Sequence, residues 1–164
     1  MGKRAALKLI LYCALAVSVV GAWGASAQAS VCAADRIDLR APFGTVSFTV
    51  EIADTVESRA QGLMHRTEMA QDAGMLFIYG RTREAGFWMK NTLIPLDMIF
   101  INARGIVHKV HSNARPHDLT PINSDGPIRA VLEINGGLAR KLGIRPGTEV
   151  RHPGLPQRRA AWPC

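Results

Sequence analysis

The strict alternation of apolar and polar residues between positions 45 and 53 constrains the fold more than any other feature of this chain. The apolar members are Val46, Phe48, Val50 and Ile52, and the polar members between them are Thr45, Ser47, Thr49 and Glu51. Because successive side chains on a β-strand point to opposite faces, this pattern predicts a strand with one buried and one exposed face. The first firm element of the chain is therefore a half-buried strand.

Other short segments have the composition of strands and are separated by turn residues. They cover residues 37–40, 75–79, 98–101, 106–111, 130–134 and 148–151. The segment 98–101 is apolar on both faces, which predicts a central strand buried on both sides. The turn that ends in Gly105 should return the next strand antiparallel to it. A turn containing Pro42 and Gly44 should pair the first segment with the alternating strand.

Two short helices are predicted between these strands. Asp54 is placed to begin the first, with Glu57 as its capping-box partner, and Gly62 is placed to end it. Asn135 is placed to cap the second, which runs to about Leu142. Many short strands plus two short helices predict a mainly β fold, either a compact β-sandwich or jelly-roll-like domain or a barrel-like one.

Residues 1–27 have the pattern of a secretory signal peptide. An apolar run at 9–20 is followed by small residues and preceded by three basic ones, Lys3, Arg4 and Lys8. Cleavage after Ala27 fits the small-x-small rule, and cleavage after Ala29 is the alternative. A retained membrane anchor is the competing interpretation, but the run is short for the roughly 20 residues that span a bilayer. We therefore expect a periplasmic or secreted protein without a stable membrane anchor after cleavage.

Composition after cleavage indicates one ordinary domain. Removal of the signal peptide lowers the formal net charge from +7 to +4, because three basic and no acidic residues are lost. This charge gives no reason to expect a nucleic-acid partner. We divide the remainder into an N-terminal segment with the first strand (28–44), a single β domain (45–151) and a proline-rich tail (152–164).

Cys32 and Cys164 are the only cysteines that remain after cleavage, one near each end of the chain. Export to an oxidising compartment favours a disulfide between them, and chain termini often lie close together. The alternative is two exposed thiols on loose tails, because the C-terminal segment contains three prolines.

The stretch from Phe87 to Asp97 has the mixed composition of a binding site. If residues 87–91 are extended, Trp88, Lys90 and Thr92 share one face, which places an indole beside an ammonium and a hydroxyl. The polar groups that could converge on a site are Arg66, Trp88, Lys90, Asn91, Thr92, Asp97 and Glu133. Structural roles are the alternatives: a salt bridge for Lys90, a turn cap for Asp97 and a core position for Trp88.

An enzyme or a metal centre is less well supported. Asp97 and Glu133 could form a carboxylate pair in a hydrolase-like site, but only if their separation suits that chemistry. Several Met and His side chains would suit copper in an exported protein. Most of these Met residues stand in apolar runs where Met ordinarily fills the core, and no metal-binding spacing occurs. We expect no cofactor, and we favour a binding role over catalysis.

Several motifs together resemble the DUF192 family of small exported or membrane-anchored bacterial and archaeal proteins. They are Gly62-Leu63-Met64 with Arg66, Gly74-Met75-Leu76-Phe77, Phe87-Trp88-Met89-Lys90-Asn91-Thr92 with Pro95-Leu96-Asp97, and Val131-Leu132-Glu133 with Gly137 and Leu142-Gly143-Ile144. The resemblance implies a compact, mainly β domain but no established activity. This chain departs from many relatives in one place: they carry a pair of Cys in the loop between the hairpin and the Val-Leu-Glu strand, whereas this chain has His117 and no Cys there.

The favoured hypothesis from sequence is an exported binding module for a sugar or another small polar or anionic ligand. We expect the ligand to stack on Trp88, to contact Lys90, Asn91 and Arg66, and to be closed over by the loop 115–127.

Overall fold

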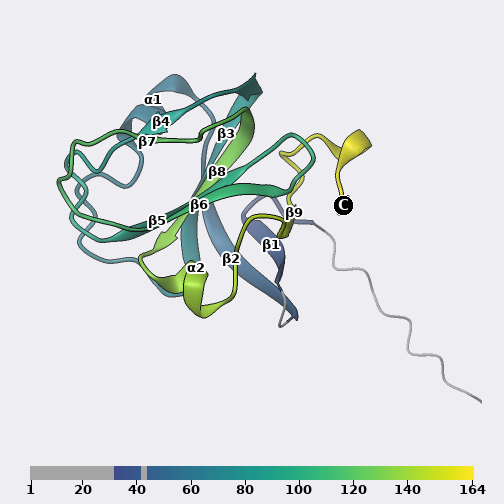
Figure 1. The fold of residues 1–164 in the computed structure, drawn as a ribbon, viewed down its shortest axis with the longest axis horizontal. Coiled ribbons are helices and arrows are strands. Elements are labelled where there is room, and N and C mark those ends of the chain that lie inside the picture. Colours follow the sequence, from purple (N-terminus) through teal and green to yellow (C-terminus); the bar gives the residue numbers. More distant parts are fainter. Residues whose placement is uncertain (1–31, 42–43) are drawn as a thin grey trace, which may run out of the picture.

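The computed structural model describes residues 32–41 and 44–164 (Figure 1). The predicted signal peptide and Pro42 lie outside these residues. The strands that the structure describes are β1 (Arg36–Ala41), β2 (Gly44–Ala53), β3 (Ala73–Arg83), β4 (Gly86–Phe87), β5 (Leu96–Ile101), β6 (Val107–Ala114), β7 (Ile122–Asn123), β8 (Ile128–Asn135) and β9 (Glu149–Arg151). The helices are α1 (Val56–Gln61), α2 (Leu138–Lys141) and a 3-10 turn, η1 (Gln157–Arg159).

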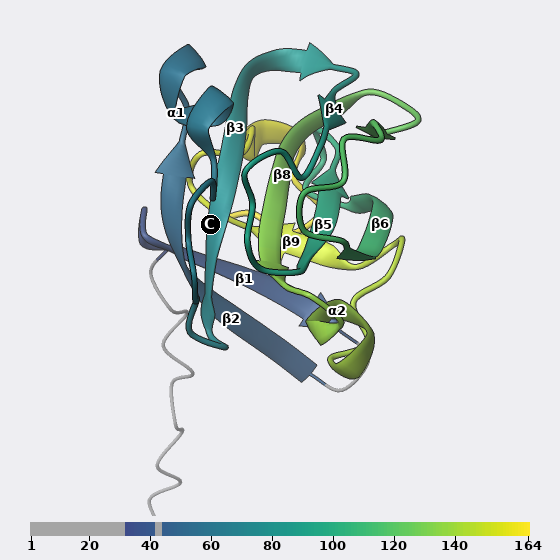
Figure 2. The same ribbon diagram turned by 90° about the vertical axis from the view of Figure 1, so that its left-hand side faces the viewer.

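Seven of these strands form one curled sheet in the order β6-β5-β8-β3-β2-β1-β9, and β4 pairs separately with β7. Neighbouring strands are antiparallel, except that β2 and β3 are parallel and joined through α1. Figure 2 shows the curl, with β1 and β2 crossing below the upright β3 and β8. An isolated bridge between Ile106 and Glu149 brings the two ends of the sheet together. The fold is therefore a half-barrel, which confirms the mainly β prediction in its barrel-like form.

The sheet separates two hydrophobic clusters. The inner cluster draws residues from all seven strands, among them Leu39, Leu76, Ile99, Leu132 and Val150. The outer cluster contains the residues that alternate with them on the central strands, such as Phe77, Met98 and Val131. Every residue of β5 is buried, because both of its faces are covered. This result confirms the prediction of a central strand at residues 98–101.

The helix caps differ from those predicted. The cap of α1 is Thr55 rather than Asp54. The backbone N–H of Ser58 donates to the Thr55 hydroxyl, and the backbone N–H of Thr55 donates to the Ser58 hydroxyl, which together form a capping box. Gly62 ends this helix as predicted, with a positive φ of 50°. The first residue of α2 follows Gly137, not Asn135, whose side chain instead donates to the carbonyl oxygens of residues 69 and 70.

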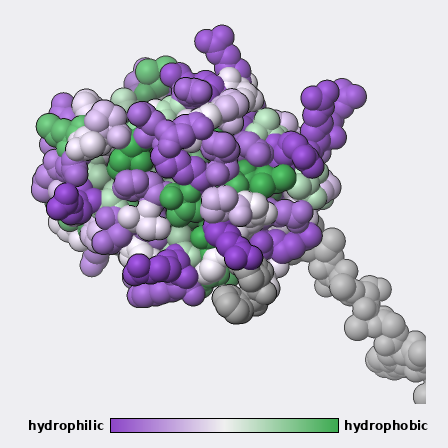
Figure 3. Space-filling view, viewed as in Figure 1, coloured by the Kyte–Doolittle hydropathy of each residue, from purple (hydrophilic) through white to green (hydrophobic). Residues whose placement is uncertain are grey.

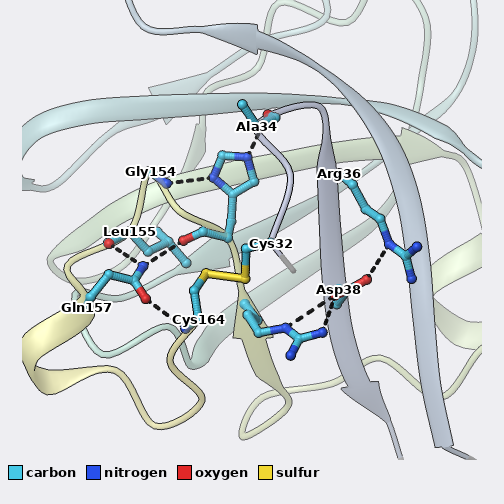
Figure 4. Close-up of a disulfide and its surroundings, with 10 residues drawn as sticks. Cys32, Ala34, Arg36, Asp38, Gly154, Leu155, Gln157 and Cys164 are labelled. Atoms are coloured by element: carbon cyan, nitrogen blue, oxygen red, sulfur yellow. Dashed lines mark hydrogen bonds and ion pairs between the residues drawn. A yellow bond between two sulfur atoms is a disulfide. The ribbon is translucent and has the colours of Figure 1, made fainter. Parts of the chain in front are cut away.

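A disulfide joins Cys32 to Cys164, which is one of the two alternatives that the sequence left open (Figure 4). The C-terminal segment is held along its length rather than loose. His152 is buried and lies 2.9 Å from the carbonyl oxygen of Ala34, and the backbone of Cys164 donates to Gln157. The guanidinium carbons of Arg40 and Arg151 lie 4.2 and 4.4 Å from the centroid of the Trp162 ring.

The surface is mostly hydrophilic, with small apolar areas between polar side chains on the face shown in Figure 3. The large apolar side chains exposed in the described chain are Val56, Trp88, Leu93 and Leu119. None of the described helices is long and apolar enough to cross a bilayer.

Candidate functional site

A partly open pocket of about 320 Å³ lies on the outer face of the sheet. Its walls come from α1 and the turn after it, from β3, from β4 with the turn that follows, and from β8. Its lining residues that carry polar or aromatic groups are Arg59, Gln61, Phe77, Tyr79, Phe87, Trp88, Lys90, Thr92 and Glu133. This volume is at the low end of the range of ligand pockets, so the pocket suits a small molecule.

Glu133 is the most unusual group in this pocket. It lies in the middle of β8, directly between Met75 of β3 and Met98 of β5, and only 4% of its surface is exposed. No side chain or backbone group in the described residues hydrogen-bonds to its carboxyl, whose oxygens face the pocket and are not among the fully enclosed polar atoms that lack a partner. Burial raises the pKa of Glu133 to about 8, because an ionised carboxylate loses its hydration there. At neutral pH it is therefore an uncharged acid that can both donate and accept a hydrogen bond.

The segment after β4 brings Trp88, Lys90 and Thr92 to the same pocket. The prediction that residues 87–91 are extended is wrong, because the chain turns at residues 90–91 and Asn91 has a φ of 54°. Trp88 is 51% exposed and so is not a core residue. The Lys90 ammonium lies 5.3 Å from the centroid of the Trp88 ring, and Lys90 forms no ion pair with any described residue. Thr92 is buried.

Arg59 and Tyr79 line the pocket and were not predicted from the sequence. Arg59 projects from α1, donates through Nη1 to the carbonyl oxygen of Ile78 at 3.0 Å, and lies 5.2 Å from the Tyr79 ring centroid. Burial raises the pKa of Tyr79. No motif marks Arg59, because its place in the site depends on how α1 lies against the end of β3.

Three predicted site residues do not line the pocket. Arg66 pairs with Glu51 at 2.5 Å beside a separate cleft, and Asn91 contacts the sulfur of Met64 at 3.9 Å. Asp97 is fully buried and accepts three backbone N–H groups, from Asn113 (2.7 Å), Gly137 (2.8 Å) and Ala139 (2.7 Å). Asp97 therefore has a structural role, but it supplies the cap that α2 lacks locally rather than the cap of its own turn that was considered for it.

The two carboxylates proposed for a hydrolase lie on opposite faces of the sheet. In the pairing of β5 with β8, Asp97 is opposite Ile134 and Glu133 is opposite Met98. Because neighbouring positions on a strand alternate in direction, Asp97 points to the inner face and Glu133 to the outer one. They cannot act together on one substrate, so the expectation of an Asp97–Glu133 pair is wrong.

The loop 115–127 does not close the pocket as predicted. Residues of this loop line a different cleft, of about 240 Å³, together with Lys109 and His111. The loop instead supports the backbone beneath Trp88, because Met89 donates to Asp118 at 2.8 Å and its carbonyl accepts from His117 at 3.1 Å. The short pairing of β4 with β7 adds to this support.

The family model for DUF192, described as Uncharacterized ACR, matches residues 40–152. The chain belongs to this family. Among solved structures, this DUF192 chain is similar to a "putative transcription regulator" from Sinorhizobium meliloti 1021. The two are 45% identical, the match covers 76% of this chain and 97% of that one, and the TM-score is 0.72. A protein of unknown function from Novosphingobium aromaticivorans DSM 12444 is also 45% identical, over 70% and 82%, with a TM-score of 0.69. No curated protein matches.

The central motif of this DUF192 domain thus has two roles. Its first half, around Trp88 and Lys90, forms one side of the pocket, and its last residue, Asp97, caps α2 on the other face of the sheet. In the described residues no three His, Cys, Asp or Glu side chains are placed to share a metal ion. Met75, Met89 and Met98 are buried members of the outer cluster, which is the core role considered for them.

Proposed function

We propose that this protein is an exported binding module that takes a sugar or another small polar or anionic ligand in the pocket above Glu133. The observation that carries the proposal is the Glu133 carboxyl, which is almost fully buried, has no partner in the described chain and lines the cavity. A group of this kind costs free energy in the free protein unless something hydrogen-bonds to it.

The surroundings of Glu133 support a binding role. Trp88 offers an exposed indole face at the pocket, and an aromatic face of this kind suits the stacking of a ligand ring. Phe87 packs edge-on against Phe77, with 5.2 Å between ring centroids, and this contact fixes the wall beside Trp88. A rigid aromatic wall with a few polar groups is the usual composition of a small-molecule site.

Export rests on the sequence, because the signal-peptide pattern of residues 1–27 lies outside the described residues. The description of the S. meliloti relative as a transcription regulator suggests a nucleic-acid role. We favour ligand binding for two reasons. The formal charge after cleavage is only +4, and the pattern of residues 1–27 predicts a periplasmic or secreted protein.

The test is a thermal-shift screen of the processed, disulfide-bonded protein against sugars, small organic acids and metal ions. A ligand that binds only the folded state raises the melting temperature. We expect Lys90→Ala to reduce the shift produced by the ligand, and Arg66→Ala, which removes the same charge outside the pocket, to leave it unchanged. The absence of a shift with every compound, or equal loss in both variants, would contradict the proposal.

A further inference from the structure

The charges that line the pocket are unbalanced. Its ionisable residues other than Tyr79 are Arg59, Lys90 and Glu133, and the acid is uncharged near neutral pH because burial raises its pKa. Five basic side chains of the described chain form ion pairs with carboxylates, namely Arg36, Arg40, Arg66, Lys109 and Arg151. Within the described chain, Arg59 and Lys90 have no such partner. The lining therefore carries two positive charges and no negative one.

The partners that Arg59 and Lys90 do have are aromatic faces. Arg59 lies over Tyr79 at 5.2 Å and Lys90 lies over Trp88 at 5.3 Å. In the described structure, only Nη1 of Arg59 donates hydrogen bonds, to the carbonyl oxygens of Asp54 and Ile78, so its other nitrogens can bind a ligand. The Lys90 ammonium has no hydrogen-bond acceptor in the same residues, so all three of its donors are open to a ligand.

An anion suits these groups better than a cation does. Aromatic side chains around a carboxyl could in principle hold an ammonium ligand through cation–π contacts. Here the protein's own cations already lie near the Trp88 and Tyr79 rings, so the positive charge of a cationic ligand would be repelled. An acidic group on a ligand would instead neutralise the lining and gain charge-assisted hydrogen bonds.

We infer that the ligand is an anionic monosaccharide, a sugar ring bearing one carboxylate or phosphate group. Its acidic group pairs with Lys90 and Arg59, its ring lies against Trp88, and a hydroxyl exchanges hydrogen bonds with the Glu133 carboxyl. The cavity of about 320 Å³ has room for one such ring and not for a chain of them. This inference rests on the proposed function and names the ligand class of the same pocket.

The experiment is isothermal titration of the processed, disulfide-bonded protein near neutral pH with four ligands: glucuronate, glucose 6-phosphate, glucose and glucosamine. We expect one or both acids to bind at least about tenfold more tightly than glucose, and glucosamine to bind most weakly. The preference between glucuronate and glucose 6-phosphate distinguishes a sugar acid from a sugar phosphate. Acetate is included because it carries the charge without the ring, and it should bind at least about tenfold more weakly than the better acid.

Charge-removing variants locate the acidic group. Lys90→Gln should lower affinity for the better acid at least about tenfold and leave any glucose binding unchanged, whereas Arg66→Gln should change neither. The Lys90 side chain makes no hydrogen bond within the described chain, and the bond from the Thr92 hydroxyl is to the Lys90 backbone carbonyl, so the variant should fold. Arg59→Gln should have the same effect as Lys90→Gln, with circular dichroism to confirm that α1 remains.

A pH series separates the role of Glu133 from general electrostatics. In the wild type, affinity for the acid should fall as pH rises through about 8, because an ionised Glu133 repels the ligand and no longer donates a hydrogen bond. Glu133→Gln should bind near neutral pH and lose little affinity in alkali, because its amide remains uncharged. The same steep loss in both proteins would overturn the role given to Glu133.

The ligand series distinguishes failure of this inference from failure of the proposed function. Tighter binding of glucose or glucosamine than of both acids would overturn the anionic assignment and leave a binding module. Acetate binding as tightly as glucuronate would overturn the sugar ring. If none of these compounds binds and the thermal-shift screen finds no other ligand, the inference and the proposed function fall together.

Discussion

The free energy of unfolding of Glu133→Gln, measured as a function of pH, tests whether Glu133 is neutral in the folded protein. The folded protein holds the Glu133 proton up to about pH 8, whereas the unfolded chain releases it near the ordinary value of 4.5. Between these two values the folded state binds more protons than the unfolded state, so the free energy of unfolding falls as pH rises. Above about pH 8 both states are ionised, and this contribution stays lost. Gln cannot ionise, so the variant lacks the whole effect.

The size of the effect follows from the pKa difference. Each unit of difference corresponds to about 1.4 kcal/mol, so a rise from 4.5 to about 8 gives a loss of up to about 5 kcal/mol across the interval. Relaxation of the pocket and entry of water reduce this value, and we expect a loss of about 2–4 kcal/mol. Near pH 5 the two proteins should differ by less than about 1 kcal/mol, because a neutral carboxyl and an amide are similar in shape and polarity.

The measurement is urea unfolding of both proteins, with the disulfide intact, from about pH 5 to about pH 9. The difference between the two curves cancels every other titrating group, and Glu133→Gln should become the more stable protein above about pH 7. Glu51→Gln is the matched control, because Glu51 occupies the same row of the sheet on β2 but is exposed and paired with Arg66. Its difference curve should stay within about 1 kcal/mol at all pH values. A flat difference curve for Glu133→Gln would refute the buried, neutral state of this acid.

Three further predictions concern the scaffold. Asp97→Asn should lower the free energy of unfolding by about 2–4 kcal/mol, because its amide cannot accept from all three backbone donors; urea titration showing a change below about 0.5 kcal/mol would contradict the capping role. Replacing Cys32 and Cys164 by Ser should cost about 2–5 kcal/mol, and wild type unfolded in reductant should match the double variant. Gly74→Ala should lower the free energy of unfolding by about 1–3 kcal/mol, because the added Cβ would lie 2.5 Å from the carbonyl oxygen of Glu133. Gly80→Ala on the same strand is the control: its Cβ would meet nothing within 4 Å, so urea titration should show little change.

The strands could be predicted from sequence because their signals are local. The alternation at residues 45–53 and the apolar run at 98–101 report which faces of a strand are covered, and the structure agrees at both. The order of the strands is not a local property. The parallel pairing of β2 with β3 and the bridge from Ile106 to Glu149 depend on which surfaces meet after the sheet curls, and no pattern within one segment encodes that choice.

The site shows the same division between local and distant information. The sequence placed Trp88, Lys90 and Thr92 on one face, and all three line the pocket, although the chain turns at residues 90–91 and is not extended there. Arg59 was missed because its approach to Tyr79 is made by the docking of a six-residue helix on another element. A cap residue such as Asp97, which serves a helix some forty positions away, has no signature in the sequence around it.

The contrast between Asp97 and Glu133 explains why only one of them marks a site. Both are buried in neighbouring central strands, and the pairing of β5 with β8 directs one to each face of the sheet. Asp97 accepts from three backbone N–H groups, and these hydrogen bonds hold a specific backbone path. Glu133 has no such donors in the described chain, so an apolar residue in its place would serve the core better. We therefore propose that the acid is kept because a ligand uses its proton, since no hydrogen-bond partner for it lies in the described chain.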